Sequence, residues 1–233
     1  MSDRVAVYCA SQALYRDCVP AIKSMILNGK PDRIYLLIED DEFPEWLPPI
    51  VKVVNVGKQK YFPLTGPNIQ TKFTFLAIMR GALAKVLPDE DKVLSLDCDT
   101  FVVGNIDELW DIDISEYYVS ASVEPVNSRW DNQYYNTGVA MFNLALMRED
   151  GIDDEIIDVL NKNKLTCPEQ DAINIVCKRM ILDMPSEFNA NNYTRKTEEI
   201  RIKHYAGFGA RQWVGLPEAI KFRNMTWDKI LNH

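Results

Sequence analysis

Apolar runs of five to seven residues recur along the first half of the chain, and each is short enough to be a strand. Residues 4–10, 33–39, 51–56 and 92–96 are rich in aliphatic and β-branched side chains, which is typical of strands buried on both faces. Between the first two runs, apolar positions recur at helical spacing from residue 14 to residue 26. A strand, a helix and a second strand in this order predict a right-handed crossover between parallel strands.

The second half of the chain mixes further strand and helix patterns. An apolar stripe at helical spacing predicts one helix over residues 69–87, which ends before Pro88. The remaining patterns predict strands at residues 117–124, 138–144 and 200–206, and helices at residues 153–161, 168–178 and 216–223. The chain as a whole is predicted to be an α/β protein with a mixed sheet.

Composition sets bounds on the kind of protein. The chain has 233 residues, of which 47% are hydrophobic and 26% charged, so it can bury one sizeable core, and we expect residues 1–233 to form a single domain. No apolar run is long enough for a membrane-spanning helix, and the first residues show no secretory signal pattern. We therefore expect a cytoplasmic protein without a transmembrane segment.

The cysteines and the net charge narrow the range of partners. The five cysteines show no CxxC spacing, which favours free thiols over a zinc site or a disulfide framework. The formal net charge of -8 argues against nonspecific binding to nucleic acid. We therefore expect no nucleic-acid partner.

The stretch VLSLDCDTFVVG, residues 93–104, carries two carboxylates at the end of a predicted core strand. Residues i and i+2 of an extended segment project to the same face, so Asp97 and Asp99 present oxygen ligands on one side. Open α/β sheets bind ligands beyond the carboxyl ends of their strands, and Mg²⁺ or Mn²⁺ needs only one or two carboxylates besides water and substrate phosphate. A plain surface turn also fits these residues, because Asp is common in turns.

Arg80 adds a second indication of an anion site. On a 3.6-residue period it falls within the apolar stripe of the helix predicted over residues 69–87. A guanidinium that faces a core needs an anion beside it. That anion is either a ligand or a structural partner such as Asp97.

The stretch KHYAGFGARQW, residues 203–213, combines an imidazole with glycines and basic side chains. His204 offers a nitrogen ligand, which suits Mn²⁺ better than Ca²⁺. Gly207 would let the backbone approach a phosphate closely, and Arg211 is near enough in sequence to neutralise its charge. A lone histidine in a strand is also compatible with a purely structural role.

The stretch CPEQDAIN, residues 167–174, places polar residues at the start of a predicted helix. Thr166 with Glu169 three residues later fits a capping box. This interpretation explains Glu169 and leaves Gln170 and Asp171 without a structural assignment.

A polar and aromatic segment precedes the strand predicted at residues 138–144. Asn136 and Gly138 lie at its end, where a turn is the simplest explanation. The aromatic side chains nearby either pack or form a platform for an acceptor; they are Trp130, Tyr134, Tyr135 and, later in the chain, Trp213.

Four stretches taken in order resemble the retaining glycosyltransferases of family 8, which include glycogenin and bacterial lipopolysaccharide galactosyltransferases. They are VLSLDCDTFVVGNIDELW, YYNTGVAMFNL, CPEQDAIN and KHYAG, and the match extends from the first strand to about Trp213. The resemblance implies a GT-A fold, which is a Rossmann-like, nucleotide-sugar-binding fold with a mixed sheet. Residues 1–104 would form its nucleotide-binding half, and residues 105–233 the half that binds the sugar and the acceptor.

The resemblance also implies a reaction. The family transfers a hexose, usually glucose or galactose, from a UDP-sugar donor to an acceptor. Its metal is Mn²⁺, for which Mg²⁺ is the alternative. The acceptor is expected to be a glycan, a protein side chain or a small molecule.

The resemblance assigns roles to individual residues. The metal ligands would be Asp97, Asp99 and His204. Contacts to the nucleotide and the diphosphate would come from Arg80, Tyr8, Ser11, Cys98, Gly207 and Arg211. The catalytic groups around the reacting sugar would be Gln170, Glu169, Asp171 and Asn136.

This sequence departs from the family pattern at two places. Many members show H-x-x-G-x-x-K-P-W, whereas HYAGFGARQW places Arg211 one position out of step with that lysine and lacks the proline. The first strand ends CASQ, where relatives often carry Asp or Asn for the base and ribose, so Ser11 and Gln12 are the polar residues there.

The resemblance favours retention by attack of the acceptor on the same face as the departing phosphate. Gln170 is a feeble nucleophile, so the phosphate oxygen would take the acceptor's proton, and a covalent intermediate on Asp171 or Glu169 is the alternative. A nucleotide-sugar hydrolase fits the same residues. A nucleotidyltransferase is less favoured, because CASQALYRDC contains no glycine-rich, basic loop.

Overall fold

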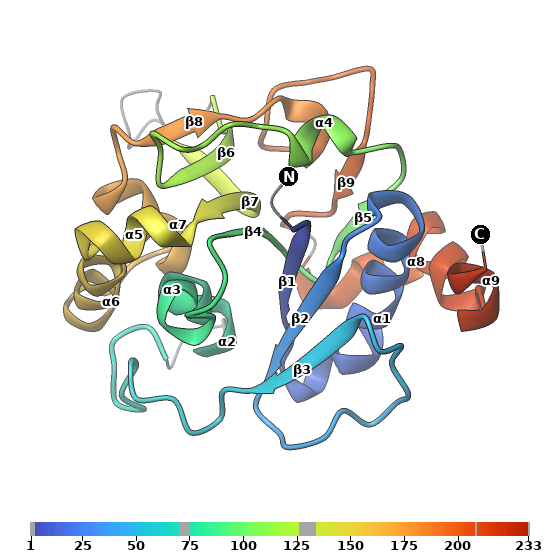
Figure 1. Cartoon of the computed structure of the whole chain (residues 1–233), viewed down its shortest axis with the longest axis horizontal. Helices are drawn as coiled ribbons and strands as arrows, with labels where there is room; N and C mark the ends of the chain where they lie inside the picture. Colours follow the sequence, from blue (N-terminus) through green and yellow to red (C-terminus); the bar gives the residue numbers. More distant parts are fainter. Residues whose placement is uncertain (1–2, 70–74, 126–133, 208, 233) are drawn as a thin grey trace.

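The apolar runs form one central sheet. The computed structural model describes residues 3–69, 75–125, 134–207 and 209–232, with the side chains of residues 209–211 left out. Figure 1 shows the sheet, whose seven strands follow the order β3-β2-β1-β4-β7-β6-β8. In chain order they are β1 (Val5–Cys9), β2 (Arg33–Ile38), β3 (Val51–Asn55), β4 (Lys92–Leu96), β6 (Val119–Val123), β7 (Tyr135–Asn143) and β8 (Ile181–Asp183).

Strand direction divides the sheet into two parts. β1 pairs in parallel with β2 and with β4, and β2 pairs in parallel with β3, as the strand–helix–strand pattern predicts. β7 runs antiparallel to both β4 and β6, and β8 is parallel to β6. The predicted α/β class and mixed sheet are confirmed.

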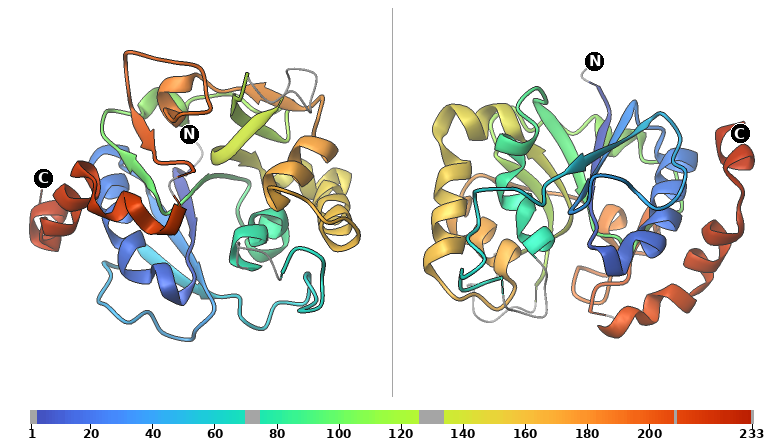
Figure 2. Two further views of the ribbon diagram at one scale, coloured as in Figure 1. Left: turned by 180° about the vertical axis from the view of Figure 1, so that it is seen from behind. Right: turned by 90° about the horizontal axis from the view of Figure 1, so that it is seen from below.

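Two helical layers cover the sheet, one on each face. Along β1, Val5 and Val7 belong to one core while Ala6 and Tyr8 belong to the other, as the alternation of side chains requires. Figures 1 and 2 show the helices in two groups on opposite sides of the sheet. The first core is closed by α5 (Leu144–Asp150), α6 (Ile152–Lys162) and α7 (Pro168–Val176), and the second by α1 (Tyr15–Ser24) and α8 (Pro217–Asn224).

A small second sheet joins distant parts of the chain. β5 (Thr100–Val102) pairs antiparallel with β9 (Ile202–His204), and Thr100 lies opposite His204. The sequence predicted a strand over residues 200–206 but not β5. With three residues, β5 is too short to produce an alternating pattern of its own.

β7 carries an irregularity in its pairing with β6. Ala121 lies opposite Ala140, but the next residue of β6, Ser122, lies opposite Asn136. Residues 137–139 are therefore extra on β7 and form a bulge, a feature that bends a strand and re-aims its side chains. The bulge lies beside the carboxyl end of β4, because Val139 is the register partner of Leu96.

The helix predicted over residues 69–87 is not one continuous element. Where the structure describes it, the chain forms α2 (Phe75–Ile78), a 3₁₀ segment (Met79–Ala82) and α3 (Leu83–Val86). Gly81 interrupts it: a Cβ there would come within 2.8 Å of Ile156 and 2.9 Å of Leu160 on α6. Glycine is also a poor helix former, so close packing here replaces regular helical geometry.

Several short elements were not predicted, namely β5, β8, α4 (Asp107–Trp110), α5 and α9 (Trp227–Leu231). All five cysteines are free, as predicted, and Cys18, Cys98 and Cys177 are buried. Among the described residues, no helix is both long and apolar enough to cross a membrane.

Candidate metal and donor site

The carboxyl end of β4 leads into a tight turn that carries the two aspartates. The Asp97 amide donates to the Gly138 carbonyl of β7 at 2.8 Å, which holds the start of the turn against the bulge. The Thr100 hydroxyl donates to the Asp97 carbonyl at 2.7 Å, which closes the turn before β5 begins. Both aspartate side chains are therefore held at a fixed place just beyond the carboxyl end of β4.

The β5–β9 pair brings His204 to the two aspartates. Nε2 of His204 lies 3.5 Å from Oδ2 of Asp97 and 3.4 Å from Oδ1 of Asp99. One ligand atom from each of the three side chains lies within 4.8 Å of the others. His204 is buried, whereas the two aspartates are partly exposed, so the group opens toward solvent on one side.

Each side chain of this group stabilises the charged form of its neighbours. Burial alone would lower the pKa of His204, but Asp99 and Asp97 outweigh it and raise that pKa from 6.5 to about 9. Burial would likewise raise the pKa of Asp97, but Arg80 and His204 outweigh it, and the pKa is lowered.

The three side chains fit a hard divalent ion. Oδ1 of Asp99 is buried and has no hydrogen-bond partner among the described residues. The Nε2–oxygen separations of 3.4–3.5 Å exceed an ordinary N–H···O hydrogen bond. Two carboxylates with one imidazole form a donor set that suits Mn²⁺ better than Ca²⁺.

Gly138 supplies the space for the imidazole. A Cβ at this position would overlap Cε1 of His204 and lie 2.8 Å from Oδ2 of Asp97. The sequence suggested only a turn here. A glycine within a strand pattern, which marks close approach of another group, was the available signal.

We expect Gly138→Ala to displace the imidazole, to lower stability by about 1–3 kcal/mol through overpacking and to abolish Mn²⁺ binding. Urea denaturation and the electron paramagnetic resonance signal of free Mn²⁺ would measure the two effects. Gly215→Ala is the matched control, because a Cβ at Gly215 meets nothing within 4 Å. Wild-type Mn²⁺ binding by Gly138→Ala would contradict the assigned packing.

Arg80 joins the aspartates to α7. Its Nη1 lies 2.8 Å from Oδ1 of Asp97, and its Nη2 lies 2.8 Å from Oε2 of Glu169. Nη1 also donates to the Thr137 carbonyl in the bulge at 3.0 Å. The predicted partner Asp97 is thus present, with Glu169 as a second carboxylate.

Glu169 has an unusual environment for a carboxylate. The Thr137 hydroxyl donates to its Oε2 at 3.0 Å, while its Oε1 is buried without a hydrogen-bond partner among the described residues. Burial raises the pKa of Glu169 from 4.5 to about 7; Arg80 opposes this shift and the charge of Asp97 adds to it.

The predicted capping box at the start of α7 is wrong. The amides of Thr166 and Cys167 donate to Oδ2 of Asp171, at 2.9 and 3.0 Å, and Cys167 is the N-cap residue. The Tyr134 hydroxyl donates to Oδ1 of the same carboxylate at 2.5 Å. Asp171 therefore accepts the backbone amides at the start of the helix, and Glu169 instead pairs with Arg80.

Gln170 and Asn136 each accept a hydrogen bond from a backbone amide of the bulge. Oε1 of Gln170 accepts the Thr137 amide at 3.1 Å, and the Gln170 side chain is partly exposed. The Asn136 side chain is buried; its Nδ2 donates to Glu124 at 2.7 Å and its Oδ1 accepts the Gly138 amide at 3.1 Å.

Four residues predicted to bind the donor lie near the ends of β1, β4 and β9. Tyr8 is fully buried in the core, and Ser11 and Cys98 are almost fully buried. The Cys98 thiol donates to the Cys9 carbonyl at 3.3 Å. Gly207 is exposed with φ +78°, and a Cβ there would collide with the Tyr193 ring. Their donor contacts stay predictions.

The suggested aromatic platform is wrong for the residues described. Tyr134, Tyr135 and Trp213 are 1%, 7% and 4% exposed, so they serve as packing. Trp130 and the side chain of Arg211 lie outside the described part of the chain.

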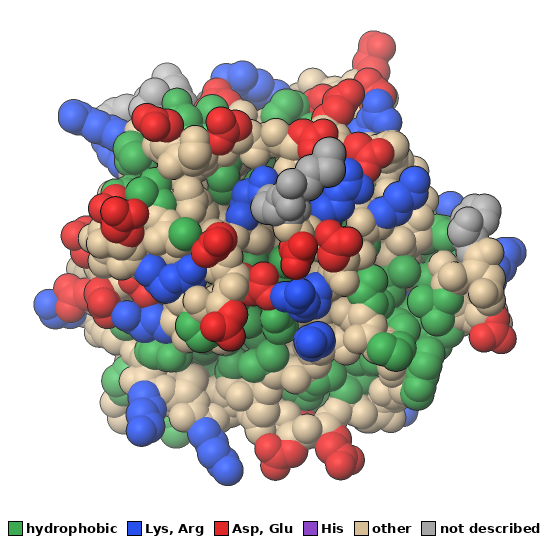
Figure 3. Space-filling model, in the orientation of Figure 1, with side chains coloured by type: hydrophobic (Ala, Val, Ile, Leu, Met, Phe, Trp, Pro, Cys, Tyr) green, Lys and Arg blue, Asp and Glu red, His purple; other side chains and the backbone are tan. Residues whose placement is uncertain are grey.

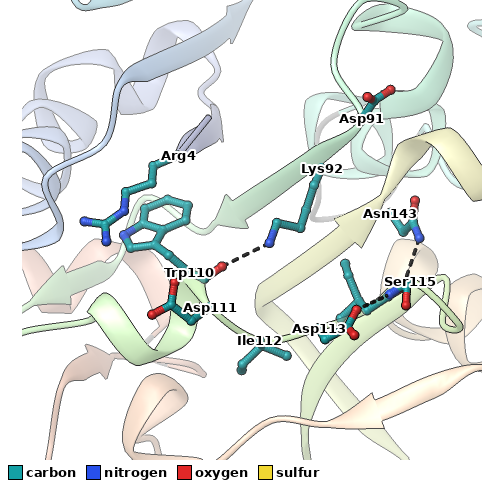
Figure 4. A pocket seen from close by; sticks show the side chains of 10 residues that line it. Arg4, Asp91, Lys92, Trp110, Asp111, Ile112, Asp113, Ser115 and Asn143 are labelled. Atoms are coloured by element: carbon teal, nitrogen blue, oxygen red, sulfur yellow. Dashed lines mark hydrogen bonds between the residues drawn. The ribbon is translucent and has the colours of Figure 1, made fainter. Parts of the chain in front are cut away.

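A separate cavity of about 400 Å³ lies at the opposite end of β4 (Figure 4). Lys92 lines it and donates to the Trp110 carbonyl at 3.0 Å, and Asn143 donates to the Ile114 carbonyl at 2.9 Å. These polar groups stabilise the surrounding backbone.

Figure 3 shows acidic and basic side chains interspersed over this view of the molecule.

Comparison with solved structures identifies the fold. The chain superimposes on the glycosyltransferase GlyE of Streptococcus pneumoniae TIGR4 with a TM-score of 0.74 and 20% identity, over 100% of this chain and 63% of that one. It superimposes on the galactosyltransferase LgtC, solved with donor and acceptor sugar analogs, with a TM-score of 0.71 and 19% identity, over 94% and 95% of the two chains. The predicted GT-A fold is confirmed.

Comparison with curated proteins gives weaker but consistent likenesses. The chain is 27% identical over 203 residues to glycosyltransferase GlyA of Streptococcus pneumoniae serotype 4, covering 81% of this chain and 28% of GlyA. It is 24% identical over 186 residues to lipopolysaccharide 1,3-galactosyltransferase of Salmonella typhimurium, covering 68% of this chain and 54% of that enzyme. This chain therefore spans about a quarter to a half of these relatives.

The family model described as Glycosyl transferase family 8 matches residues 45–213. That range contains both aspartates, the bulge of β7, the start of α7 and His204. The chain belongs to glycosyl transferase family 8.

Proposed function

We propose that this protein is a retaining glycosyltransferase that moves glucose or galactose from a UDP-sugar to an acceptor, with Mn²⁺, or Mg²⁺ in its place, as cofactor. One observation carries the proposal: in a chain of family 8, one ligand atom from each of Asp97, Asp99 and His204 lies within 4.8 Å of the others. Two carboxylates and an imidazole so close together form a donor set that suits Mn²⁺.

Asp97, Asp99 and His204 would hold the ion. When bound, it would supply positive charge that stabilises the diphosphate leaving group. Arg80 keeps Asp97 and Glu169 in position and adds a fixed positive charge beside them. Burial would lower the pKa of Arg80, but Asp97 and Glu169 outweigh this and raise it further, so the guanidinium stays protonated.

The sugar would lie between β7 and α7. Glu169 is buried behind this site, where it would hold Arg80 and Thr137 in place. Gln170, partly exposed at the start of α7, would lie beside the anomeric carbon. The exposed backbone at Gly207 would approach the diphosphate, and Ser11 the nucleoside.

Retention would proceed by attack of the acceptor on the same face as the departing phosphate. A covalent intermediate needs a free carboxylate, and both oxygens of Asp171 already accept hydrogen bonds from Tyr134 and the start of α7. Glu169 is buried, with Oε2 bonded to Arg80 and Thr137, so it is poorly placed to attack a sugar. The acceptor's proton would therefore pass to the phosphate oxygen.

The remaining assignments follow from this role. Residues 1–104 would form the nucleotide-binding half and residues 105–233 the sugar- and acceptor-binding half of one GT-A domain. The acceptor would be a glycan, a protein side chain or a small molecule. The five free thiols support a reducing compartment such as the cytoplasm.

A donor screen tests the function. UDP-glucose, UDP-galactose and other nucleotide sugars are added with and without Mn²⁺, and binding is followed by calorimetry and melting temperature. We expect a UDP-hexose to bind only with the metal, and the glycoside product to keep the anomeric configuration of the donor. Free sugar as the sole product, with every acceptor class present, would identify a hydrolase instead.

We expect Mn²⁺ affinity to rise with pH. The pKa of His204, raised to about 9, keeps the imidazole protonated in the metal-free protein, and only the neutral ring can bind a metal. The dissociation constant should therefore fall by about tenfold per pH unit from pH 6.5 to 8.5 and level off above 9. Calorimetry in buffers of matched ionic strength measures this, and His204→Gln should flatten the profile. A wild-type affinity independent of pH would contradict the role of His204.

A further inference from the structure

The second nitrogen of His204 also has a defined partner. Nδ1 lies 2.7 Å from Oδ1 of Asn189, on the side of the ring away from the two aspartates. Asn189 is fully buried at the end of a 3₁₀ segment (Ser186–Asn189). In the neutral ring, the form that binds a metal, whether Nδ1 carries the hydrogen depends on which atom of the Asn189 amide faces it.

The side-chain amide of Asn136, which contacts Asn189, has its orientation determined by a backbone amide and a carboxylate. The Gly138 N–H is a donor only, and it donates to Oδ1 of Asn136 at 3.1 Å. On the other side of this amide, Nδ2 of Asn136 donates to Oε1 of Glu124 at 2.7 Å. Both contacts require the oxygen of Asn136 to face Asn189.

The orientation of Asn189 follows from that of Asn136. Its Nδ2 donates to Oδ1 of Asn136 at 2.9 Å and lies 3.3 Å from the Asn136 carbonyl, which can only accept. The oxygen of Asn189 must then face His204.

Asn191 supports the same orientation from the opposite side. Its Oδ1 accepts the amides of Tyr193 and Thr194, at 2.7 and 3.1 Å, so its nitrogen faces inward. That nitrogen donates to Oδ1 and to the carbonyl of Asn189, at 3.0 and 3.1 Å; Nδ1 of His204 is farther, at 3.4 Å. The Asn189 oxygen therefore receives one hydrogen from Asn191 and one from His204.

We propose that Asn189 is a positioning residue that holds the hydrogen of His204 on Nδ1 and turns the lone pair of Nε2 toward Asp97 and Asp99. The inference rests on the proposed metal role of His204. Glu124 and Gly138 act through Asn136 to keep the Asn189 amide in this orientation. Partners of this kind orient metal-ligating histidines and raise metal affinity.

The backbone keeps Asn189 and His204 in register. The Ala190 amide donates to the Ile202 carbonyl and the His204 amide donates to the Ala190 carbonyl, both at 3.0 Å. The Thr194 hydroxyl donates to the Asn189 carbonyl at 2.8 Å. Loss of the Asn189 amide would therefore remove the hydrogen bond to His204 without freeing the segment that carries it.

Mn²⁺ alone, added to the full chain, tests the inference. Asn189→Leu removes the acceptor and should weaken Mn²⁺ binding by about 10–100-fold. Asn189→Asp keeps an acceptor for Nδ1–H but loses the donor to Asn136, so it should retain most of the affinity. A merely structural role predicts equal losses for both. Asn68→Leu, which removes a buried amide that bonds the Leu160 and Asn163 carbonyls, controls for destabilisation and should leave the affinity unchanged.

Nitrogen-15 spectra give a readout independent of affinity. The chain has two histidines, so a His233→Gln background leaves His204 as the sole source of ¹⁵N-histidine signals. With diamagnetic Cd²⁺ bound, Nδ1 should carry a proton protected from water and Nε2 should bind the metal. The protected proton should disappear in Asn189→Leu and remain in Asn189→Asp.

The outcomes separate this inference from the proposed function. Wild-type Mn²⁺ affinity in Asn189→Leu, or metal bound through Nδ1, would overturn the role of Asn189 alone. No Mn²⁺ binding by the wild-type chain would overturn both this role and the metal site. The expected losses, in a chain that transfers no sugar from any donor, would support the role of Asn189 and overturn the proposed reaction.

Discussion

Asp99→Asn is expected to lower kcat/KM for sugar transfer by on the order of 10²–10³-fold, because loss of one preorganised electrostatic group costs that much. The substitution preserves shape but removes the charge of the oxygen that has no hydrogen-bond partner in the described structure. Asp99 is a better test than Asp97, whose carboxylate also pairs with Arg80. Initial rates at saturating Mn²⁺, with donor concentration varied, would measure the loss.

The control removes the same charge elsewhere. Asp89 is exposed, and Asp89→Asn should leave transfer and Mn²⁺ affinity at wild-type values. Undiminished turnover in Asp99→Asn would show that the metal assignment is wrong. An equal loss in Asp89→Asn would attribute the effect to net charge.

Arg80→Met is expected to cost about 3–5 kcal/mol in the free energy of unfolding, because it leaves a buried carboxylate unpaired. Arg80 is 7% exposed and Glu169 is 4% exposed, so water cannot replace the lost partner. The pKa of Glu169 is raised to about 7 with Arg80 in place, and removal of Arg80 raises it further. The loss should therefore be smaller at pH 6, where this carboxyl is mostly protonated in both proteins, than at pH 8. Urea denaturation at pH 6 and pH 8 would measure both effects.

A double variant tests the cause of that loss. Arg80→Met with Glu169→Gln removes the stranded charge and should recover part of the stability, which a double-mutant cycle would quantify. Arg179 is exposed, and Arg179→Met should change stability by no more than about 0.5 kcal/mol. Equal stability of Arg80→Met and the wild type would show that the ion pairs are unimportant for folding.

Local sequence patterns were sufficient to predict the strands of the parallel half of the sheet. β1, β2 and β4 are mostly apolar runs buried on both faces, whereas β3, at the edge of the sheet, was predicted from its valines although it is only partly buried. The proximity of Asp97 and Asp99 was also predictable, because it depends only on two residues in one turn. The pairing of Arg80 with Asp97 followed from a charge placed within an apolar stripe.

Contacts between distant segments were not predictable from such patterns. β5 has three residues and is defined by its pairing with β9, so no local signal marks it. The position of His204 beside the aspartates was available only from the family resemblance. The capping-box interpretation failed because Arg80, 89 residues away in sequence, attracts the Glu169 carboxylate.

The role of Asn189 lay beyond sequence reasoning for a related reason. An asparagine in a loop is ordinary, and its importance arises from the direction of hydrogen bonds that begin in Glu124 and end in His204. Direction of this kind depends on which backbone groups lie nearby, which only the folded chain reveals.

Because of the bulge at residues 137–139, the site depends on the number of residues in β7 as well as on their identity. One residue fewer would move Thr137 away from Arg80 and would rotate a side chain into the space that Gly138 leaves for the imidazole. Substitution libraries that vary only residue identity would overlook this dependence. Single-residue deletions and insertions in this bulge of β7 should be tolerated less than most point changes around it.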